Sequence, residues 1–116
     1  MIYGTGIDII EIDRIEKAIK RWGKTFLEHV FLKEEIEYAR RRKFPTQHFA
    51  ARFAAKEAVL KAFGENSHIS WKDIKITNDK DGKPLCQYRD KKFKRKILIS
   101  ISHTKTYAVA SAIITS

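Results

Sequence analysis

The chain has 116 residues, of which 43% are hydrophobic and 33% charged, a balance typical of one globular domain rather than a disordered or membrane-spanning chain. A formal charge of +10 indicates an anionic partner, which could be nucleic acid, an acidic protein or a phosphate-rich small molecule. The apolar runs are too short to span a membrane, no secretory signal is evident, and the lone Cys86 excludes an intramolecular disulfide. We therefore expect one domain, residues 1–116, that is cytoplasmic.

The N-terminal part of the chain predicts a strand and then a helix. Residues 2–10 are mostly apolar and β-branched, which favours a strand, and Asp8 is the only charged residue within it. Asp13, with Glu16 three residues later, is expected to cap the helix that follows. Gly23 is expected to end that helix.

The middle of the chain predicts further helices. Residues 26–42 form a helical region that we expect to be broken near Leu32, and Pro45 is expected to mark a loop after it. Residues 49–63 are rich in Ala, Leu, Lys and Glu and contain no Pro, which favours a helix with Gly64 as its C-terminal cap.

The last part of the chain predicts strands. Residues 69–77 and 85–88 are expected to be strands joined by the turn-rich segment 78–84. Residues 96–102 and 107–114 are two further β-rich runs, and the short connection between them is the clearest hairpin pattern in the chain. Helices followed by a small antiparallel sheet predict the α+β class.

Glu57 is a charged residue on the stripe of the central helix that carries Ala50 and Ala54. A carboxylate in such a stripe loses hydration, which is costly unless a cation or hydrogen bonds compensate. One interpretation is a structural ion pair with Lys61, one helical turn further on. The other is a cation site, for which Asp8 is the natural second ligand, although an Asp in an apolar strand is more often a strand-end cap.

The chemistry of two carboxylates points to one metal more than to others. Together with phosphate oxygens and water they suit Mg²⁺, which prefers oxygen ligands and seldom takes an all-protein cage. The chain has no Cys/His cluster, which argues against zinc.

Two loops could meet an anionic ligand. Residues 79–82 superficially match a calcium loop, but the third acidic ligand and the terminal Glu are missing, so we interpret them as a turn beside which Lys83 could contact a ligand. His103, next to Thr104 and Lys105, could be simply solvated or could contact a phosphate. No Gly-rich loop of the Walker or dinucleotide-binding type is present.

The first predicted helix carries a basic stripe. Arg14, Lys17 and Arg21 recur at spacings of three and four, which places them on one side. Such a stripe is by default a solvated face. Because it begins shortly after Asp8, it could also receive an acidic helix beside the cation site.

Four segments in register carry a resemblance to a known family. They are Gly4–Ile9, Phe49–Ala58, Asp81–Pro84 and Ser100–Thr104. In order and spacing they resemble holo-acyl-carrier-protein synthases, the small bacterial 4′-phosphopantetheinyl transferases, along the whole chain. Leu32, where family members often have Thr or Ser, and residues 65–68, where a Gly-rich connection is commoner, depart from the pattern.

The resemblance implies a fold of that family and a specific reaction. Such enzymes move the 4′-phosphopantetheine arm of coenzyme A onto a serine of apo-acyl carrier protein, release adenosine 3′,5′-bisphosphate and support fatty acid biosynthesis. Small members of the family are homotrimers with sites between neighbouring subunits, and neither nucleic acid nor a membrane is an expected partner.

The resemblance also implies roles for particular residues. Asp8 and Glu57 match the magnesium ligands, and with Lys61 they are the expected catalytic residues. The segments expected to bind coenzyme A contain Arg52, Lys61, Gly64, Lys83, Pro84, His103 and Thr104. The helix expected to bind the carrier protein presents Arg14, Lys17 and Arg21.

Two other classes of protein compete with this interpretation. A nucleic-acid-binding module is favoured by the charge and by the basic run 40–43, but no recognisable nucleic-acid-binding motif is present. A purely structural subunit would leave the carboxylates Asp8 and Glu57 unexplained.

Overall fold

The computed structural model describes residues 1–65 and 67–116 and confirms the α+β class. Residue 66, in the segment that departs from the family pattern, lies outside the described residues. The first half of the chain contains β1 (Ile2–Glu11), α1 (Ile12–Trp22), α2 (Lys24–Val30), α3 (Lys33–Arg40) and α4 (Pro45–Phe63). The second half contains the 3-10 helix η1 (Trp71–Asp73) and β2 (Ile74–Asn78), β3 (Pro84–Tyr88), β4 (Lys96–His103) and β5 (Tyr107–Thr115).

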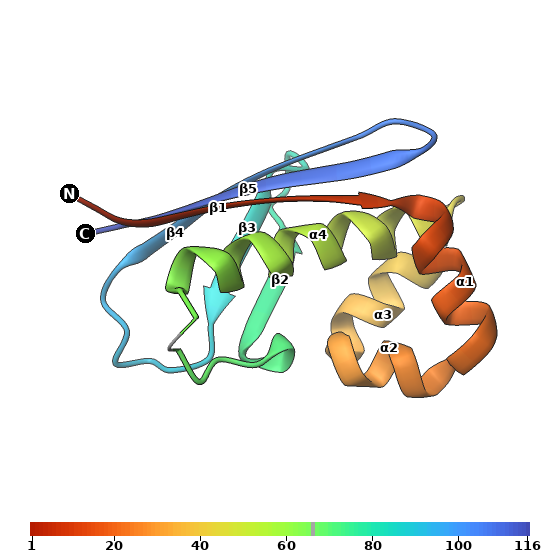
Figure 1. Cartoon of the computed structure of the whole chain (residues 1–116), viewed down its shortest axis with the longest axis horizontal. Coiled ribbons are helices and arrows are strands. Elements are labelled where there is room, and N and C mark those ends of the chain that lie inside the picture. Colours follow the sequence, from red (N-terminus) through yellow and green to blue (C-terminus); the bar gives the residue numbers. More distant parts are fainter. Residues whose placement is uncertain (66) are drawn as a thin grey trace.

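The strands form two antiparallel sheets rather than one. The N-terminal strand β1 pairs with β5, which also pairs with β4, in the order β1-β5-β4. Strands β2 and β3 form a separate hairpin. Helix α4 runs along the three-stranded sheet, α1 to α3 gather at one end of it, and the two chain termini lie side by side at the other (Figure 1).

Two glycines allow β1 to lie directly against α4. Gly4, Gly6 and Asp8 alternate along the strand and therefore share one face, the face toward the helix. A Cβ atom on Gly4 would overlap the backbone carbonyl of Ala62, and one on Gly6 would overlap that of Ala58. The two glycines of the Gly-x-Gly-x-Asp segment thus permit the close packing that brings Asp8 near the helix.

Replacing Gly6 by Ala is expected to destabilise the protein by about 1–3 kcal/mol or more, because the added methyl group must push β1 away from α4. Urea unfolding measures this change. Thr5→Ala is the matched control, since Thr5 is exposed and a change there should alter stability by less than about 0.5 kcal/mol. Equal stability of the Gly6 variant and the wild type would contradict the tight contact.

The expected helix cap at Asp13 is wrong. Helix α1 begins two residues earlier than a cap at Asp13 predicts, at Ile12, and Glu11 at its N-cap position makes no side-chain capping bond. The backbone N–H of Ile12 instead donates to the carbonyl of Thr106, at 2.8 Å, in the β4–β5 connection. Asp13 lies in the first turn and forms an ion pair with Lys17 at 2.9 Å. A tertiary contact therefore takes the place of the local cap.

Two further expectations need correction. Residues 69–77 are not one strand, because the Asp73 carboxylate accepts hydrogen bonds from the backbone N–H and the hydroxyl of Ser70, at 2.9 and 3.2 Å, and closes the turn of η1 before β2 begins. Pro45 does not lie in a loop but is the first residue of α4, where its missing N–H removes no helical hydrogen bond. The break near Leu32 and the cap at Gly64 are confirmed.

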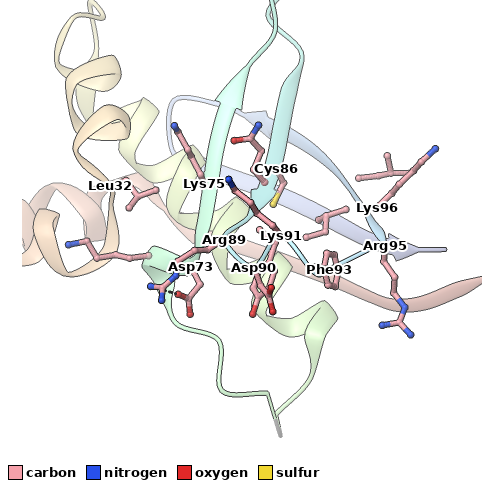
Figure 2. Close-up of a pocket in the computed structure, with 15 residues that line it drawn as sticks. Leu32, Asp73, Lys75, Cys86, Arg89, Asp90, Lys91, Phe93, Arg95 and Lys96 are labelled. Atoms are coloured by element: carbon pink, nitrogen blue, oxygen red, sulfur yellow. Dashed lines mark ion pairs between the residues drawn. The ribbon is translucent and has the colours of Figure 1, made fainter.

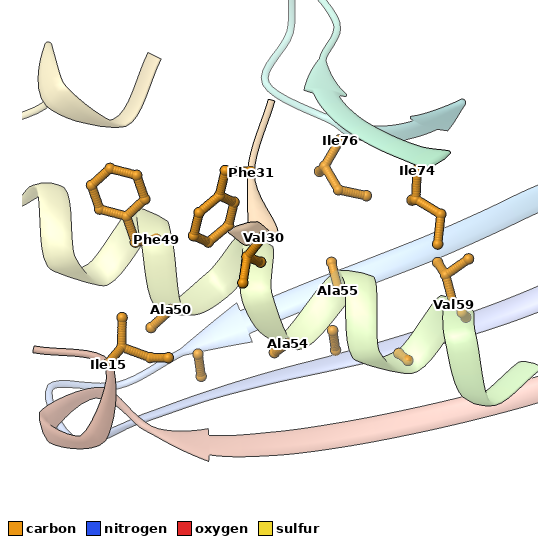
Figure 3. Close-up of a cluster of buried hydrophobic side chains, with 14 of the residues drawn as sticks. Ile15, Val30, Phe31, Phe49, Ala50, Ala54, Ala55, Val59, Ile74 and Ile76 are labelled. Atoms are coloured by element: carbon orange, nitrogen blue, oxygen red, sulfur yellow. The ribbon is translucent and has the colours of Figure 1, made fainter. Parts of the chain in front are cut away.

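The core lies on two sides of α4. Ala50, Ala54 and Ala58 are fully buried, and small side chains of β5 such as Ala108 and Ala110 are buried under the same helix. Larger side chains cover another side of α4, where they approach from α2, from the segment after it and from β2 (Figure 3). These are Val30, Phe31, Ile74 and Ile76. Small residues let the helix approach the sheet closely, and large ones fill the wider space on the other side.

Lys56 and Glu35 form an ion pair inside this core. Their side chains are 0% and 1% exposed, and 2.7 Å separates Lys56 Nζ from Glu35 Oε1. Lys56 also donates to the carbonyls of Val30 and Trp71, each at 3.0 Å. Burial lowers the pKa of Lys56, and the charge of Glu35 opposes that shift. This pair was not predicted from the sequence.

Glu35 also explains where α3 begins. Its Oε1 accepts the backbone N–H of Leu32 at 2.7 Å, which caps the helix from within although Leu32 itself has no capping group. Its Oε2 accepts the backbone N–H of Ile76 at 2.8 Å, so the same side chain attaches β2 to the helices.

Candidate functional site

Asp8, Glu57 and Lys61 come together where β1 packs against α4. Lys61 Nζ lies 3.3 Å from Asp8 Oδ1 and donates a hydrogen bond to the carbonyl of Ile7 at 3.0 Å. In the described part of the chain Lys61 therefore pairs with Asp8, not with Glu57 as the structural interpretation of the sequence expected. Asp8 and Glu57 are close enough for the charge of one to influence the other.

The negative charges of Asp8 and Glu57 are only partly compensated by nearby hydrogen bonds and positive charge. Asp8 has a side chain that is only 15% exposed, and its Oδ2 is buried without a hydrogen bond from any described residue. Burial raises the pKa of Glu57, the charge of Asp8 raises it further, and Lys61 opposes both effects. Among the described residues, Lys61 thus faces both acids. An added cation would satisfy Asp8 Oδ2 and offset the repulsion between the acids.

The donor set fits a hard divalent cation with open coordination positions. Among the described residues, no three His, Cys, Asp or Glu side chains gather at one point. A cation held by Asp8 and Glu57 would therefore take further ligands from a substrate or from water, which is how proteins commonly hold Mg²⁺ with phosphates.

A cavity of about 280 Å³ contains three other residues expected at the site. Arg52 of α4, Pro84 of β3 and His103 of β4 line it, together with Tyr38 of α3 and His48 of α4. The resemblance assigned Arg52, Pro84 and His103 to coenzyme A binding. The cavity brings them together although they are far apart in the sequence.

Arg52 is held in place by neutral groups. It is buried, and it donates to the carbonyl of Ile76 and, at 2.7 Å, to Asn78 Oδ1. Its guanidinium carbon lies 4.1 Å from the centre of the Tyr38 ring. Burial lowers the pKa of Arg52. None of the described groups that accept its hydrogen bonds is a carboxylate, so it leaves the cavity positive.

The remaining residues expected to bind coenzyme A lie on loops. Gly64 ends α4 with a positive φ of 99° and is exposed. Lys83 is exposed in the turn before β3, whose backbone is held by Asp79 Oδ1, 2.9 Å from the Lys83 nitrogen. The Thr104 hydroxyl accepts the backbone N–H of Thr106 and of Tyr107, at 3.1 and 3.0 Å. Thr104 therefore shapes the β4–β5 turn, a role that the sequence did not predict.

The two groups of site residues lie on different sides of α4. Arg52 and Glu57 are about 140° apart around the helix axis at about 100° per residue. In agreement, Glu57 is close to β1, whereas Arg52 contacts β2 and α3. Within one chain the carboxylates and the positive cavity are thus separated by the helix itself.

The basic stripe of α1 is exposed. Arg14, Lys17 and Arg21 all face solvent, and Arg21 lies over the exposed ring of Trp22, 4.9 Å from its centre. Lys17 is partly neutralised, because it pairs with Asp13. The stripe is positive, with Arg14 and Arg21 as its unpaired members among the described residues.

A groove of about 760 Å³ lies between β3 and the start of β4 and contains none of the residues expected at the site (Figure 2). Basic side chains surround it, and one of them, Arg89, pairs with Asp73 at 3.3 Å. Cys86 contributes to its wall. Burial raises the pKa of Cys86 to about 12, so the thiol stays protonated at neutral pH.

Comparison with known proteins gives one consistent result. The model of the 4′-phosphopantetheinyl transferase superfamily matches residues 4–112. A holo-[acyl-carrier-protein] synthase of Thermodesulfovibrio yellowstonii is 44% identical, over 99% of this chain and 100% of its own. One from Protochlamydia amoebophila is 49% identical, over 97% and 98%.

Solved structures agree with the sequences. A holo-(acyl-carrier-protein) synthase from Bacillus anthracis in complex with CoA (3′,5′-ADP) has a TM-score of 0.88 at 39% identity and covers 100% of this chain and 98% of its own. The Helicobacter pylori enzyme in complex with coenzyme A has a TM-score of 0.86 at 33% identity and covers 96% and 99%.

The fold and the matches together define a phosphopantetheinyl transferase. The chain belongs to the 4′-phosphopantetheinyl transferase superfamily and, within it, to the holo-acyl-carrier-protein synthase family. The resemblance found in the sequence is confirmed.

Two residues of the cavity, Tyr38 and His48, were not predicted from the sequence. Tyr38 lies in a separate helix and carries no motif. His48 precedes Arg52 by one helical turn, and this spacing of four was the only available signal that both face the same side.

Proposed function

We propose that this enzyme transfers the 4′-phosphopantetheine group of coenzyme A to a serine of apo-acyl carrier protein in a magnesium-dependent reaction that releases adenosine 3′,5′-bisphosphate. The proposed setting is fatty acid biosynthesis in the cytoplasm. The observation that carries the proposal is the pair of neighbouring carboxylates, Asp8 and Glu57, whose charges are only partly compensated by the described residues. They lie in a fold that is shared with relatives solved in complex with coenzyme A.

The proposed chemistry is a phosphoryl transfer. The serine oxygen attacks the phosphorus that carries the pantetheine arm, a new O–P bond forms, and the bond to the bridging oxygen of the diphosphate breaks. Bound Mg²⁺ would offset negative charge on the diphosphate. Asp8 and Glu57 would hold it, and Lys61, already beside Asp8, would stabilise the leaving phosphate.

Glu57 is the proposed acceptor of the serine proton. In the protein without metal, burial and Asp8 raise the pKa of Glu57 above its ordinary value, and a cation held beside it would oppose both effects. The proposed role of Glu57 as proton acceptor therefore rests on its position at the site. Arg52, Lys83, Pro84, His103 and Thr104, with Gly64, would receive the nucleotide end of coenzyme A.

We further propose a homotrimer with the sites between subunits. One face of the three-stranded sheet is covered by α4, while the opposite face exposes Ile7, Ile9 and Leu98, which are 65%, 63% and 52% exposed. Burying such apolar side chains stabilises an interface. Contact between subunits would also bring the carboxylates of one subunit to the cavity of the next, which α4 prevents within one chain. Analytical ultracentrifugation measures the assembly directly.

Mass spectrometry of the carrier protein tests the proposed activity. Incubation of apo-acyl carrier protein with this enzyme, coenzyme A and Mg²⁺ should increase the carrier mass by that of one 4′-phosphopantetheine group, and omission of the metal should prevent this. An unchanged mass under complete conditions would contradict the proposal and return attention to the nucleic-acid-binding and structural alternatives.

Arg14→Ala is expected to raise the KM for carrier protein about fivefold, the equivalent of about 1 kcal/mol, and to leave the KM for coenzyme A nearly unchanged. The dependence of the carrier KM on salt should weaken as well. Steady-state kinetics with each substrate varied in turn measures both. Lys20→Ala is the matched control, since Lys20 is exposed on α1 but lies outside the stripe and pairs with Glu16. An unchanged carrier KM would remove Arg14 from the docking surface.

A further inference from the structure

His48 lies in the cavity that contains Arg52 and His103, and it has no role in the proposed reaction as described above. It comes from α4, one turn before Arg52. Its ring meets that of Tyr38 edge to face, with the centroids 5.9 Å apart and the planes at 77°. The aromatic contact fixes an imidazole at the wall of the cavity.

The groups that face His48 in the described part of the chain are all neutral or positive. Arg52 comes from α4, His103 from β4, and Tyr38 from α3, while Arg42 follows the end of α3. The guanidinium carbons of Arg42 and Arg52 lie 4.0 and 4.1 Å from the centre of the Tyr38 ring. None of the described residues that line the cavity is Asp or Glu.

This environment opposes protonation of His48 while the cavity holds no anion. Burial lowers the pKa of His48, and Arg42, Arg52 and His103 lower it further in that order. The ring is therefore mainly neutral near pH 7. A phosphate group would reverse the balance, because its negative charge attracts a proton to the imidazole and screens it from the arginines.

We propose that His48 is a proton-coupled contact for the phosphate-bearing nucleotide end of coenzyme A, neutral in the free enzyme and protonated when that phosphate enters the cavity. The inference rests on the proposed function, since it takes the cavity to be the place where the nucleotide binds. It adds that binding takes up a proton and that acidification strengthens it.

The size of the effect follows from linkage. If binding raises the pKa of His48 by about two units, the affinity for coenzyme A rises about fivefold to tenfold through this residue between about pH 8 and about pH 6.5. The range stops there because a phosphate monoester itself takes up a proton near pH 6. A variant without the imidazole shows the pH dependence that comes from the phosphate of coenzyme A alone. The difference between wild type and that variant is the contribution of His48.

Isothermal titration calorimetry of the full chain with coenzyme A, without carrier protein, tests this directly. Titrations near pH 7 in buffers of different ionisation enthalpy give the number of protons taken up. The variant is His48→Phe, which keeps a ring against Tyr38, with His48→Gln as a second variant if the first does not fold. His29→Phe is the matched control, because His29 is exposed on α2.

The wild type and the His29 variant should take up about half a proton more than the His48 variants, and only they should show the full pH dependence. Equal proton uptake by wild type and His48 variants that still bind coenzyme A would overturn the inference and leave the proposed function intact. Failure of the wild type itself to bind coenzyme A would overturn both.

Discussion

Glu57→Gln is expected to fold normally and to lower kcat/KM for transfer by at least about a hundredfold. The amide keeps the size of the side chain but removes one of the two charges that would hold Mg²⁺ and the proposed acceptor of the serine proton. Removal of one such electrostatic group commonly costs about 10²–10³ in rate. The rate of carrier modification, followed by mass spectrometry, measures the loss.

The stability of Glu57→Gln, compared with that of the wild type, shows whether its loss of activity comes from misfolding. Burial and Asp8 raise the pKa of Glu57 above its unfolded value, so its ionisation is less favourable in the folded protein. The destabilisation grows as pH rises from the ordinary range of a glutamate through the raised pKa. Glu57→Gln lacks this effect and should therefore unfold at the same or a higher temperature than wild type at neutral pH.

The control for Glu57 is a glutamate remote from the site. Glu28 is exposed on α2 and pairs only loosely with Lys24, at 3.6 Å. Glu28→Gln should keep wild-type turnover. If Glu57→Gln also retains it, the carboxylate pair is not the centre of the reaction.

Lys56→Met is expected to lower the free energy of unfolding by about 3–5 kcal/mol, the largest stability change that the structure predicts. The substitution leaves Glu35 buried without its cation, and removing one partner of a buried pair is strongly destabilising. It also leaves the carbonyls of Val30 and Trp71 without their donor. Urea unfolding at neutral pH measures the change.

Lys20→Met provides the comparison for Lys56. Lys20, like Lys56, pairs with a glutamate. Its partner Glu16 lies one turn earlier in the same helix, at 3.0 Å, and the pair is on the exposed surface of α1. Its loss should lower the free energy of unfolding by less than about 1 kcal/mol. Comparable effects of the two substitutions would show that the buried pair stabilises the fold no more than a surface pair.

The buried pair is also connected to the candidate site by hydrogen bonds. Glu35 holds the N–H of Ile76, and the carbonyl of the same residue accepts from Arg52. Arg52 in turn donates to Asn78, whose amide donates to the carbonyl of Gly82 at 3.0 Å. One chain of hydrogen bonds therefore connects the core to the cavity and to the turn that carries Lys83.

Local pattern determined most of the secondary structure. The central helix, its end at Gly64, the break near Leu32 and the final hairpin all follow from the spacing of apolar residues and from glycine, because these features depend on neighbours within a few residues. The three wrong assignments, at Asp13, Pro45 and residues 69–77, lie at element boundaries. There a distant carbonyl, a local side-chain bond or a proline that lacks the N–H decides where an element begins.

The sequence by itself determined the family, because four motifs in register match it, and through that resemblance it predicted the residues of the proposed site. Only the tertiary structure decided their partners. It placed Lys61 on Asp8, Lys56 on Glu35, and His48 beside Tyr38, and it set the carboxylates and the positive cavity on different sides of α4. These contacts join residues that lie far apart in the chain, and their energies depend on burial and nearby charge, which no spacing along the sequence records.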